Sequence, residues 1–278
     1  MNRANKAEAI WIQPTTGALG ADVHGVDLAV PLDAAAFQRI ADAWSEHLVL
    51  RFSGQRLDDE ALLAFSRHFG ELDRIPIGTG DTEREDNGVA EHARPWVVVI
   101  SNVKVAGKAI GGLGSYELAW HTDMSYNPVP PRASLLYALE CPARGGDTGF
   151  VNMYTAYETL PDDLKRRIQG LTCVHDASWN SAGERRRGYQ SITDVRQTPG
   201  AVHPIVRLHP VTRRKCLFLG RRTNAYIHGL SVADSEALLD QLWTHVAKPE
   251  LAWYQRWRVG DLVLWDNRCT MHRRDSLD

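Results

Sequence analysis

The segment Asp261–His272, which reads DLVLWDNRCTMH, begins with a short apolar run and ends with a histidine. The apolar run is bounded by polar residues and has the length of a buried β-strand. Earlier in the chain, Trp120–Asp123 reads WHTD. On an extended strand the side chains of residues two apart point to the same face, so His121 and Asp123 are expected to face the same way. His272 must then come from a second strand that the fold brings alongside.

Two histidines and one aspartate in this pattern suggest a metal site. Two imidazoles and one carboxylate on one face of a metal ion form the site of non-haem Fe(II) oxygenases, which leaves three coordination positions open. The pattern alone is weak, because a His-x-Asp triplet arises by chance in a chain with 11 histidines. The same ligands also bind Ni, Cu or Zn, so a cupin-type isomerase or hydrolase that uses another divalent ion stays an alternative.

The context of the two motifs resembles the TauD/TfdA family of Fe(II)/2-oxoglutarate-dependent dioxygenases along nearly the whole chain. Landmarks similar to those of the family follow one another in the family's order: Gly20–Leu28 (GADVHGVDL), Phe65–Leu72 (FSRHFGEL), Trp120–Asp123, Pro130-Pro131, Gly145–Thr148 (GGDT), His203-Pro204 and Gly260–Arg268. The resemblance implies a mainly β fold with outer helices, a double-stranded β-helix or jelly roll. We expect a single domain over residues 1–278.

The resemblance also implies a site and a reaction. His121, Asp123 and His272 would bind Fe(II), and Thr148, in the GGDT tract, would bind the cosubstrate 2-oxoglutarate. Dioxygen would take the last open position, and the reaction would hydroxylate a substrate C–H bond while 2-oxoglutarate becomes succinate and CO2. Where the hydroxylated carbon bears oxygen, sulfur or nitrogen, the net result is bond cleavage. Halogenating relatives lack the carboxylate that Asp123 supplies, so its presence favours oxygenation.

Two arginines of the family pattern are not found in this sequence. The family clamps the far carboxylate of 2-oxoglutarate with an arginine about eleven residues after the distal histidine, and often uses a further arginine beyond it for the acid group of the substrate. Both positions would lie past Asp278, so we expect either that the C-terminal end of the domain is missing from this sequence or that 2-oxoglutarate binding is impaired. Arg273 and Arg274 follow His272 directly, and we do not expect either to turn back into the site.

The substrate is expected to be a small anionic molecule, similar to an aryloxyalkanoate. Taurine-type relatives carry polar groups where Ile75 and Gly78 lie, and an asparagine where Glu117 lies, which disfavours taurine. The tract Gly220–Arg222 looks closer to the aryloxyacetate-cleaving branch. A sulfonate or sulfate-ester dioxygenase of the same family and a non-catalytic jelly-roll binding protein are the alternatives.

Each candidate substrate contact also has an ordinary structural explanation. Candidate contacts are Glu117, Met124, Arg221 and Arg222. Met124, Tyr126 and Trp179 are candidates for an apolar pocket wall, although most such residues simply belong to the core. Either arginine would serve equally well in a surface ion pair.

Helical spacing of apolar residues predicts outer helices over residues 33–47 and 58–69 and a third helix around 238–246. Thr155–Glu158 fits a capping box, and Pro161 fits the start of a helical turn that reaches Ile168. Runs of β-type residues predict strands at Trp96–Ile100, Leu135–Leu139, Gly149–Met153, Leu171–Val174, Val202–Leu208, Cys216–Leu219 and Asp261–Trp265.

The composition is that of an ordinary globular enzyme. The chain has 278 residues, 44% of them hydrophobic, and a formal net charge of -2. This charge gives no reason to expect a nucleic acid or membrane partner, and without a signal peptide or membrane span a cytoplasmic location is expected. The sequence does not decide whether the protein forms a homo-oligomer. The four cysteines form no C-x-x-C pair, so neither a disulfide framework nor a zinc site is expected. Cys269, three residues before His272, could line the site, but we expect it to be a small buried apolar residue on a strand.

Overall fold

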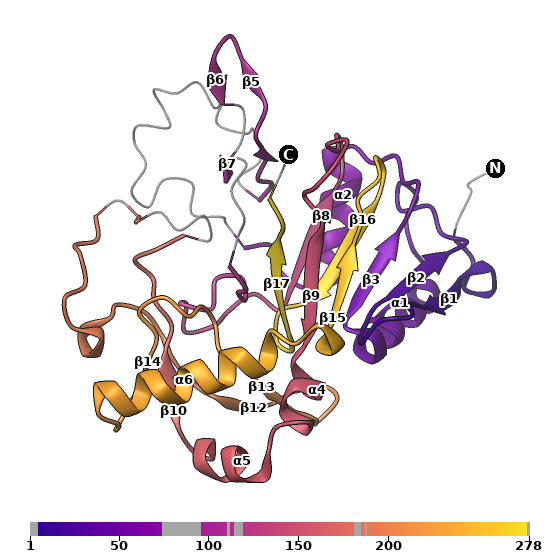
Figure 1. Ribbon diagram of the computed structural model, residues 1–278. Helices are drawn as coiled ribbons and strands as arrows, with labels where there is room; N and C mark the ends of the chain where they lie inside the picture. Colours follow the sequence, from indigo (N-terminus) through magenta and orange to yellow (C-terminus); the bar gives the residue numbers. More distant parts are fainter. Residues whose placement is uncertain are drawn as a thin grey trace.

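The larger sheet of the protein combines strands from both halves of the chain (Figure 1). The computed structural model describes residues 5–73, 96–109, 112–113, 119–180, 185–186 and 188–276. The strand order is β1 (Trp11–Pro14), β2 (Ala21–His24), β3 (Val49–Phe52), β16 (Leu262–Asp266) and β8 (Ala133–Tyr137). Neighbouring strands are antiparallel except β2 and β3, which are parallel. The apolar run of the opening motif is therefore a central strand, paired on both sides.

A second, three-stranded antiparallel sheet has the order β15 (Ala252–Gln255), β9 (Thr148–Asn152) and β17 (Thr270–Arg274). In its register, His272 lies opposite Phe150, and Arg274 lies opposite Thr148. Residues 267–269 form the turn between β16 and β17. This turn links the two sheets and leads directly to the distal histidine.

Residues of β16 alternate between two hydrophobic cores. Leu262 and Leu264 belong to a core that includes Phe52 and Phe65, whereas Val263 and Trp265 belong to a core that includes Phe150. All four β16 side chains are buried. Because side chains alternate across a strand, a strand covered on both faces reads as an uninterrupted apolar run.

Helices α1 (Ala34–His47) and α2 (Asp59–Arg67) contribute to the first of these cores, and Figure 1 shows both behind the five-stranded sheet. Each begins at an aspartate cap, since Asp33 accepts from the N–H of Ala36 and Asp58 accepts from the N–H of Ala61. The two outer helices predicted near 33–47 and 58–69 are thus confirmed.

The remaining described elements lie outside the two larger sheets. The helices are α4 (Met153–Glu158), α5 (Asp162–Ile168) and α6 (Val232–Val246), with 3-10 turns at Ala7–Ala9, Val195–Gln197 and Pro249–Leu251. The smaller sheets pair β10 (Thr172–Val174) with β11 (Val202–Pro204) and β14 (Tyr226–Ile227), β12 (Val206–Leu208) with β13 (Lys215–Leu217), β4 (Ile100–Ser101) with β7 (Gly112–Leu113), and β5 (Lys104–Val105) with β6 (Lys108–Ala109).

Three local predictions were wrong. The capping box at Thr155–Glu158 does not form, because α4 starts earlier, at a cap made by Asn152, whose side chain accepts from the N–H groups of Tyr154 and Thr155. The run Val202–Leu208 is two strands, because the chain changes its partner from β10 to β13 at Ile205. Only the last residue of Trp96–Ile100 is in a strand.

Among the residues that the structure describes, no helix is both long enough and apolar enough to span a bilayer. All four cysteines are free thiols.

Candidate metal centre and active-site cavity

His121, Asp123 and His272 converge on one point. The Nε2 atoms of His121 and His272 each lie 3.6 Å from Oδ1 of Asp123. One ligand atom from each residue can be chosen so that the three lie within 4.8 Å of one another. A single ion placed among three such atoms can contact all of them, which is the spacing that a facial two-His-one-carboxylate site requires.

The segment that carries His121 and Asp123 is not the extended strand predicted from their spacing. His121 forms an isolated antiparallel bridge with His272, and Asp123 already belongs to a turn. The next residue, Met124, has a positive φ of 45°, which an extended strand excludes. The side chains nevertheless converge, because the bridge places the backbone of His121 directly beside that of His272.

The ring of His121 is oriented for metal binding by its backbone neighbour. Nδ1 of His121 lies 2.8 Å from the carbonyl oxygen of Ala119. A carbonyl only accepts, so Nδ1 carries the proton and Nε2 keeps its lone pair for a ligand. Metal-binding histidines usually make such a hydrogen bond with the second ring nitrogen.

The charges of the cluster also suit a cation. Burial alone would raise the pKa of the Asp123 carboxyl, but the two imidazoles and the hydroxyl of Ser134 outweigh burial and lower this pKa. Burial lowers the pKa of His272 to about 3, against the opposing attraction of Asp123. Near neutral pH the site therefore offers one carboxylate and a neutral His272 imidazole, and this is the protonation that a divalent metal needs. The residues fit an Fe(II) ion.

The three residues line a cavity of about 2130 Å³. Typical small-molecule pockets occupy roughly 300–1,000 Å³, so there is room for a cosubstrate and a substrate together. Met124, Tyr126, Thr148 and Arg221 line the same cavity. Trp179 is outside the described lining, and its carbonyl instead accepts a hydrogen bond from Arg221.

Thr148 begins β9 and presents a hydroxyl whose own proton is available. Its Oγ1 accepts a hydrogen bond from Nε1 of Trp257 at 2.9 Å. Since the indole nitrogen can only donate, the hydroxyl proton of Thr148 is left to donate to a further acceptor. Thr148 is 5% exposed and lines the cavity, so this acceptor would be a molecule bound there.

Arg274 lines the same cavity, so the expectation that it would not turn back into the site was wrong. It lies two residues after His272 on β17, and residues two apart on a strand share a face. Arg273 points the other way and stacks over Trp120, with its guanidinium carbon 5.1 Å from the ring centroid. The alternation of the strand, applied to β17, would have identified Arg274 from sequence.

The two candidate arginines of the Gly220–Arg222 tract have different surroundings. Arg221 is 8% exposed and lines the cavity, and burial lowers the pKa of its guanidinium to about 10, so it stays charged. Arg222 forms ion pairs at 2.6 Å with Glu236 and with Asp240 of helix α6. Arg222 is therefore a structural residue outside the described lining of the cavity. Glu117 lies outside the described residues.

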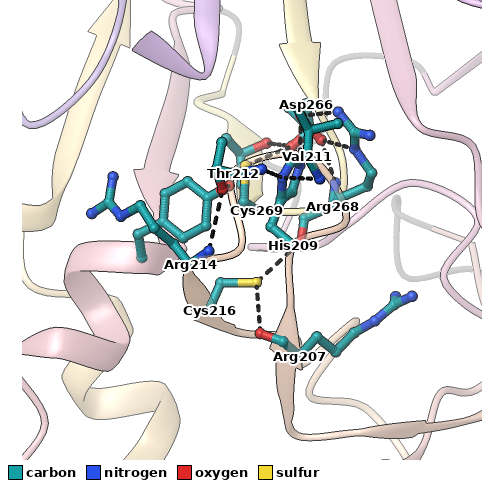
Figure 2. A network of polar contacts seen from close by, with 11 residues as sticks. Arg207, His209, Val211, Thr212, Arg214, Cys216, Asp266, Arg268 and Cys269 are labelled. Atoms are coloured by element: carbon teal, nitrogen blue, oxygen red, sulfur yellow. Dashed lines mark hydrogen bonds and ion pairs between the residues drawn. The ribbon is translucent and has the colours of Figure 1, made fainter. Parts of the chain in front are cut away.

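A second cluster, formed by His209, Asp266 and Cys269, also brings three potential ligand atoms within 4.8 Å (Figure 2). Its carboxylate is already neutralised, because Arg268 donates to Oδ1 of Asp266 at 2.8 Å and to Oδ2 at 2.5 Å. Nδ1 of His209 accepts from the N–H groups of Val211 and Thr212, so Nε2 carries the proton that faces Asp266. A cation would meet a guanidinium and an N–H, and the cluster is structural.

Cys269 lies in this second cluster and not in the cavity. Its side chain is 2% exposed, and burial raises the pKa of its thiol. The sequence-based reading of Cys269 as a buried apolar residue is confirmed, although it lies in the turn between β16 and β17 and not on a strand.

Known proteins resemble this chain over nearly its whole length. The family model described as "Taurine catabolism dioxygenase TauD, TfdA family" matches residues 11–278. The (S)-phenoxypropionate/alpha-ketoglutarate-dioxygenase of Sphingobium herbicidovorans is 34% identical over 97% of this chain and 91% of that protein. The alpha-ketoglutarate-dependent sulfate ester dioxygenase of Pseudomonas putida is 34% identical over 94% of this chain and 82% of that protein. The crystal structure of AAD-2 in complex with Mn(II) and N-oxalylglycine has a TM-score of 0.73 at 30% identity, over 97% of this chain and 92% of that one.

The chain belongs to the TauD/TfdA family of alpha-ketoglutarate-dependent dioxygenases. The predicted jelly-roll core with outer helices is confirmed by these structural relatives. The protein is thus an oxidoreductase that uses Fe(II), with 2-oxoglutarate (alpha-ketoglutarate) and dioxygen as cosubstrates.

Proposed function

We propose that His121, Asp123 and His272 bind Fe(II) and that the protein hydroxylates a small anionic substrate similar to an aryloxyalkanoate. The observation that carries the proposal is the convergence of the three side chains, with Nε2 to Oδ1 distances of 3.6 Å, on the wall of one cavity. With 2-oxoglutarate and dioxygen bound, the metal supplies the oxidant that hydroxylates a substrate C–H bond. The protein supplies the ligands, the orientation of both organic molecules and the exclusion of water.

The cosubstrate is proposed to lie toward Thr148. The available hydroxyl proton of Thr148 would donate to a carboxylate oxygen, and such charge-assisted bonds are short and strong. Arg274, directly opposite Thr148 in the register of β9 and β17, adds a positive charge at the same end of the cavity. Trp257 fixes the direction in which the Thr148 hydroxyl donates.

The acid group of the substrate is proposed to lie near Arg221. This side chain keeps its charge although it is almost fully buried, and a buried guanidinium is strongly stabilised by an anionic partner. Tyr126 and Met124 line the same cavity and would contact the apolar part of the substrate. Hydroxylation of a carbon next to the ether oxygen of an aryloxyalkanoate gives an unstable product, so the C–O bond would break.

A sulfate ester or a sulfonate is the second candidate substrate. It is supported by the 34% identity to the sulfate ester dioxygenase of Pseudomonas putida. Arg221 would serve a sulfate as well as a carboxylate, because both present oxygens that a planar guanidinium can bind in pairs. We place either activity in the cytoplasm, in keeping with four cysteines that are all free thiols.

The proposal is tested by adding Fe(II) and then 2-oxoglutarate to the purified chain without oxygen. The expected result is a weak visible charge-transfer band, which forms when the cosubstrate chelates the bound iron. Succinate release is then measured with aryloxy acids, sulfonates and sulfate esters. A chain that binds no Fe(II) would overturn the proposed metal site. A band with turnover of only uncharged substrates would overturn the proposed substrate class.

A further inference from the structure

The two oxygen atoms of the Asp123 carboxylate have different surroundings. Oδ1 faces the Nε2 atoms of His121 and His272, each at 3.6 Å. Oδ2 accepts a hydrogen bond from Oγ of Ser134 at 2.7 Å. One oxygen is thus turned to the proposed metal position, and the other is held by the protein.

Ser134 is itself held by a buried amide. Nδ2 of Asn267 donates to Oγ of Ser134 at 2.7 Å, and Nε1 of Trp265 donates to Oδ1 of Asn267 at 3.0 Å. The indole N–H can only donate, so it fixes which end of the Asn267 amide is the oxygen. Nδ2 must then face Ser134. Because Ser134 accepts this bond, its single hydroxyl proton goes to Asp123.

Ser134, which contacts Oδ2 of Asp123, lies on strand β8, whereas Asp123 lies in a turn. Trp265 and Ser134 are opposite one another in the register of the central strand β16 and its neighbour β8, the last strand of the sheet. Asn267 is 1% exposed, and its backbone N–H donates to the carbonyl of Arg132. The preceding residue, Asp266, ties the same turn to His209 through the structural cluster of Figure 2. The turn between β16 and β17 is therefore fixed on both sides.

We propose that Trp265, Asn267 and Ser134 form a positioning relay that holds the Asp123 carboxylate with Oδ1 toward the metal. The inference rests on the proposed function, because it assigns these residues a role in binding the metal of that site. None of the three relay residues is itself placed as a ligand. Asn267 acts only through Ser134, and Ser134 acts only through Oδ2 of Asp123.

The relay is tested by titrating the full chain with Co(II) alone and following its visible absorption. Removal of partners behind a metal ligand typically weakens metal binding by about 10–100-fold. We expect Ser134→Ala and Asn267→Leu each to raise the dissociation constant for Co(II) by about tenfold or more. Ser134→Thr keeps the hydroxyl and should restore an affinity close to that of the original chain. Ser235→Ala is the matched control, since this buried serine of helix α6 accepts from the N–H of Ile227 on β14 and does not line the cavity.

The double variant separates a relay from simple packing. If Asn267 acts through Ser134, Asn267→Leu in the Ser134→Ala background should change the dissociation constant by less than about twofold. Fold changes that multiply in the double variant, or single variants that bind Co(II) as tightly as the original chain, would overturn the relay. Thermal unfolding of the metal-free proteins shows that each variant is folded, and Ser134→Ala with Ser134→Thr decides the question where Asn267→Leu does not fold. An original chain that binds no Co(II) would instead overturn the proposed metal site, and the relay with it.

Discussion

The backbones of His121 and His272 hydrogen-bond to each other in both directions. The N–H of His121 donates to the carbonyl of His272 at 2.9 Å, and the N–H of His272 donates to the carbonyl of His121 at 2.8 Å. The two proposed ligands are therefore held side by side by main-chain atoms alone. Because the bridge does not involve the imidazoles, changes to these side chains should leave the local backbone in place.

Replacing any of the proposed ligands with alanine should abolish metal binding and turnover without unfolding the chain. His121→Ala, Asp123→Ala and His272→Ala each remove one of three ligands, while the main-chain bridge persists. Fe(II) titration measures metal binding, succinate release measures turnover, and far-UV circular dichroism shows whether the chain stays folded. His228→Ala, a change at an exposed histidine, is the control. Turnover that still depends on 2-oxoglutarate in Asp123→Ala would count strongly against the site.

The parts of the site that sequence could predict are those carried by short motifs. His121, Asp123 and His272 lie in segments whose context matched a family, and β16 was recognised because an apolar run of its length is a strand buried on both faces. The helical spacing of apolar residues also predicted α1 and α2. In each case the information lies within a few neighbouring residues.

The parts that sequence did not predict depend on contacts between distant segments. Ser134 contacts Asn267 across 133 residues, and no local pattern distinguishes it from any other strand serine. At Ile205 the chain stops pairing with β10 and starts pairing with β13, and this depends on which strands lie alongside. The bridge between His121 and His272, found where a strand was expected, depends in the same way on a distant segment. Sequence alone does not distinguish Arg222 from Arg221, because the ion pairs of Arg222 are made with residues of the distant helix α6.

Thr148 should control the affinity for 2-oxoglutarate through its hydroxyl. Thr148→Val keeps the size of the side chain but removes the donor, and a hydrogen bond to a charged group contributes about 1.5–3 kcal/mol. We therefore expect the KM for 2-oxoglutarate to rise by roughly tenfold or more, with Thr148→Ser close to the original value. The measurement is succinate release at varied 2-oxoglutarate. An unchanged KM in Thr148→Val would place the cosubstrate elsewhere in the cavity.

Arg221 and Arg222 form a matched pair for testing the substrate site. Arg221→Gln should raise the KM for an anionic substrate by roughly tenfold or more, because a buried charged partner is lost, and should leave the KM for 2-oxoglutarate nearly unchanged. Arg222→Gln breaks only the pairs with Glu236 and Asp240 and should leave both KM values unchanged. Equal effects of the two substitutions would contradict a direct role of Arg221.

The metal-free protein should lose stability in mild acid, because it buries neutral histidines. His175 is 1% exposed and stacks on Phe218, with ring centroids 5.2 Å apart. Burial, reinforced by the charges of His203 and nearby arginines, lowers the pKa of His175 to about 3. An unfolded histidine titrates near 6.5. The stabilising effect of the neutral ring is therefore complete above about pH 6.5 and is lost progressively as the pH falls toward 3.

Between about pH 6.5 and 3 the unfolded chain binds one more proton at His175 than the folded chain does, so the free energy of unfolding falls by about 1.4 kcal/mol per pH unit from this residue alone. His175→Asn removes the titrating group and should make the pH dependence shallower by about that amount, whatever its stability at pH 7. Urea unfolding followed by circular dichroism between pH 7 and 5 gives both slopes. The same substitution at the exposed His228 is the control for a histidine outside the core. A slope unaffected by His175→Asn would contradict the prediction, because it would show that His175 binds its proton over the same pH range in the folded and the unfolded chain.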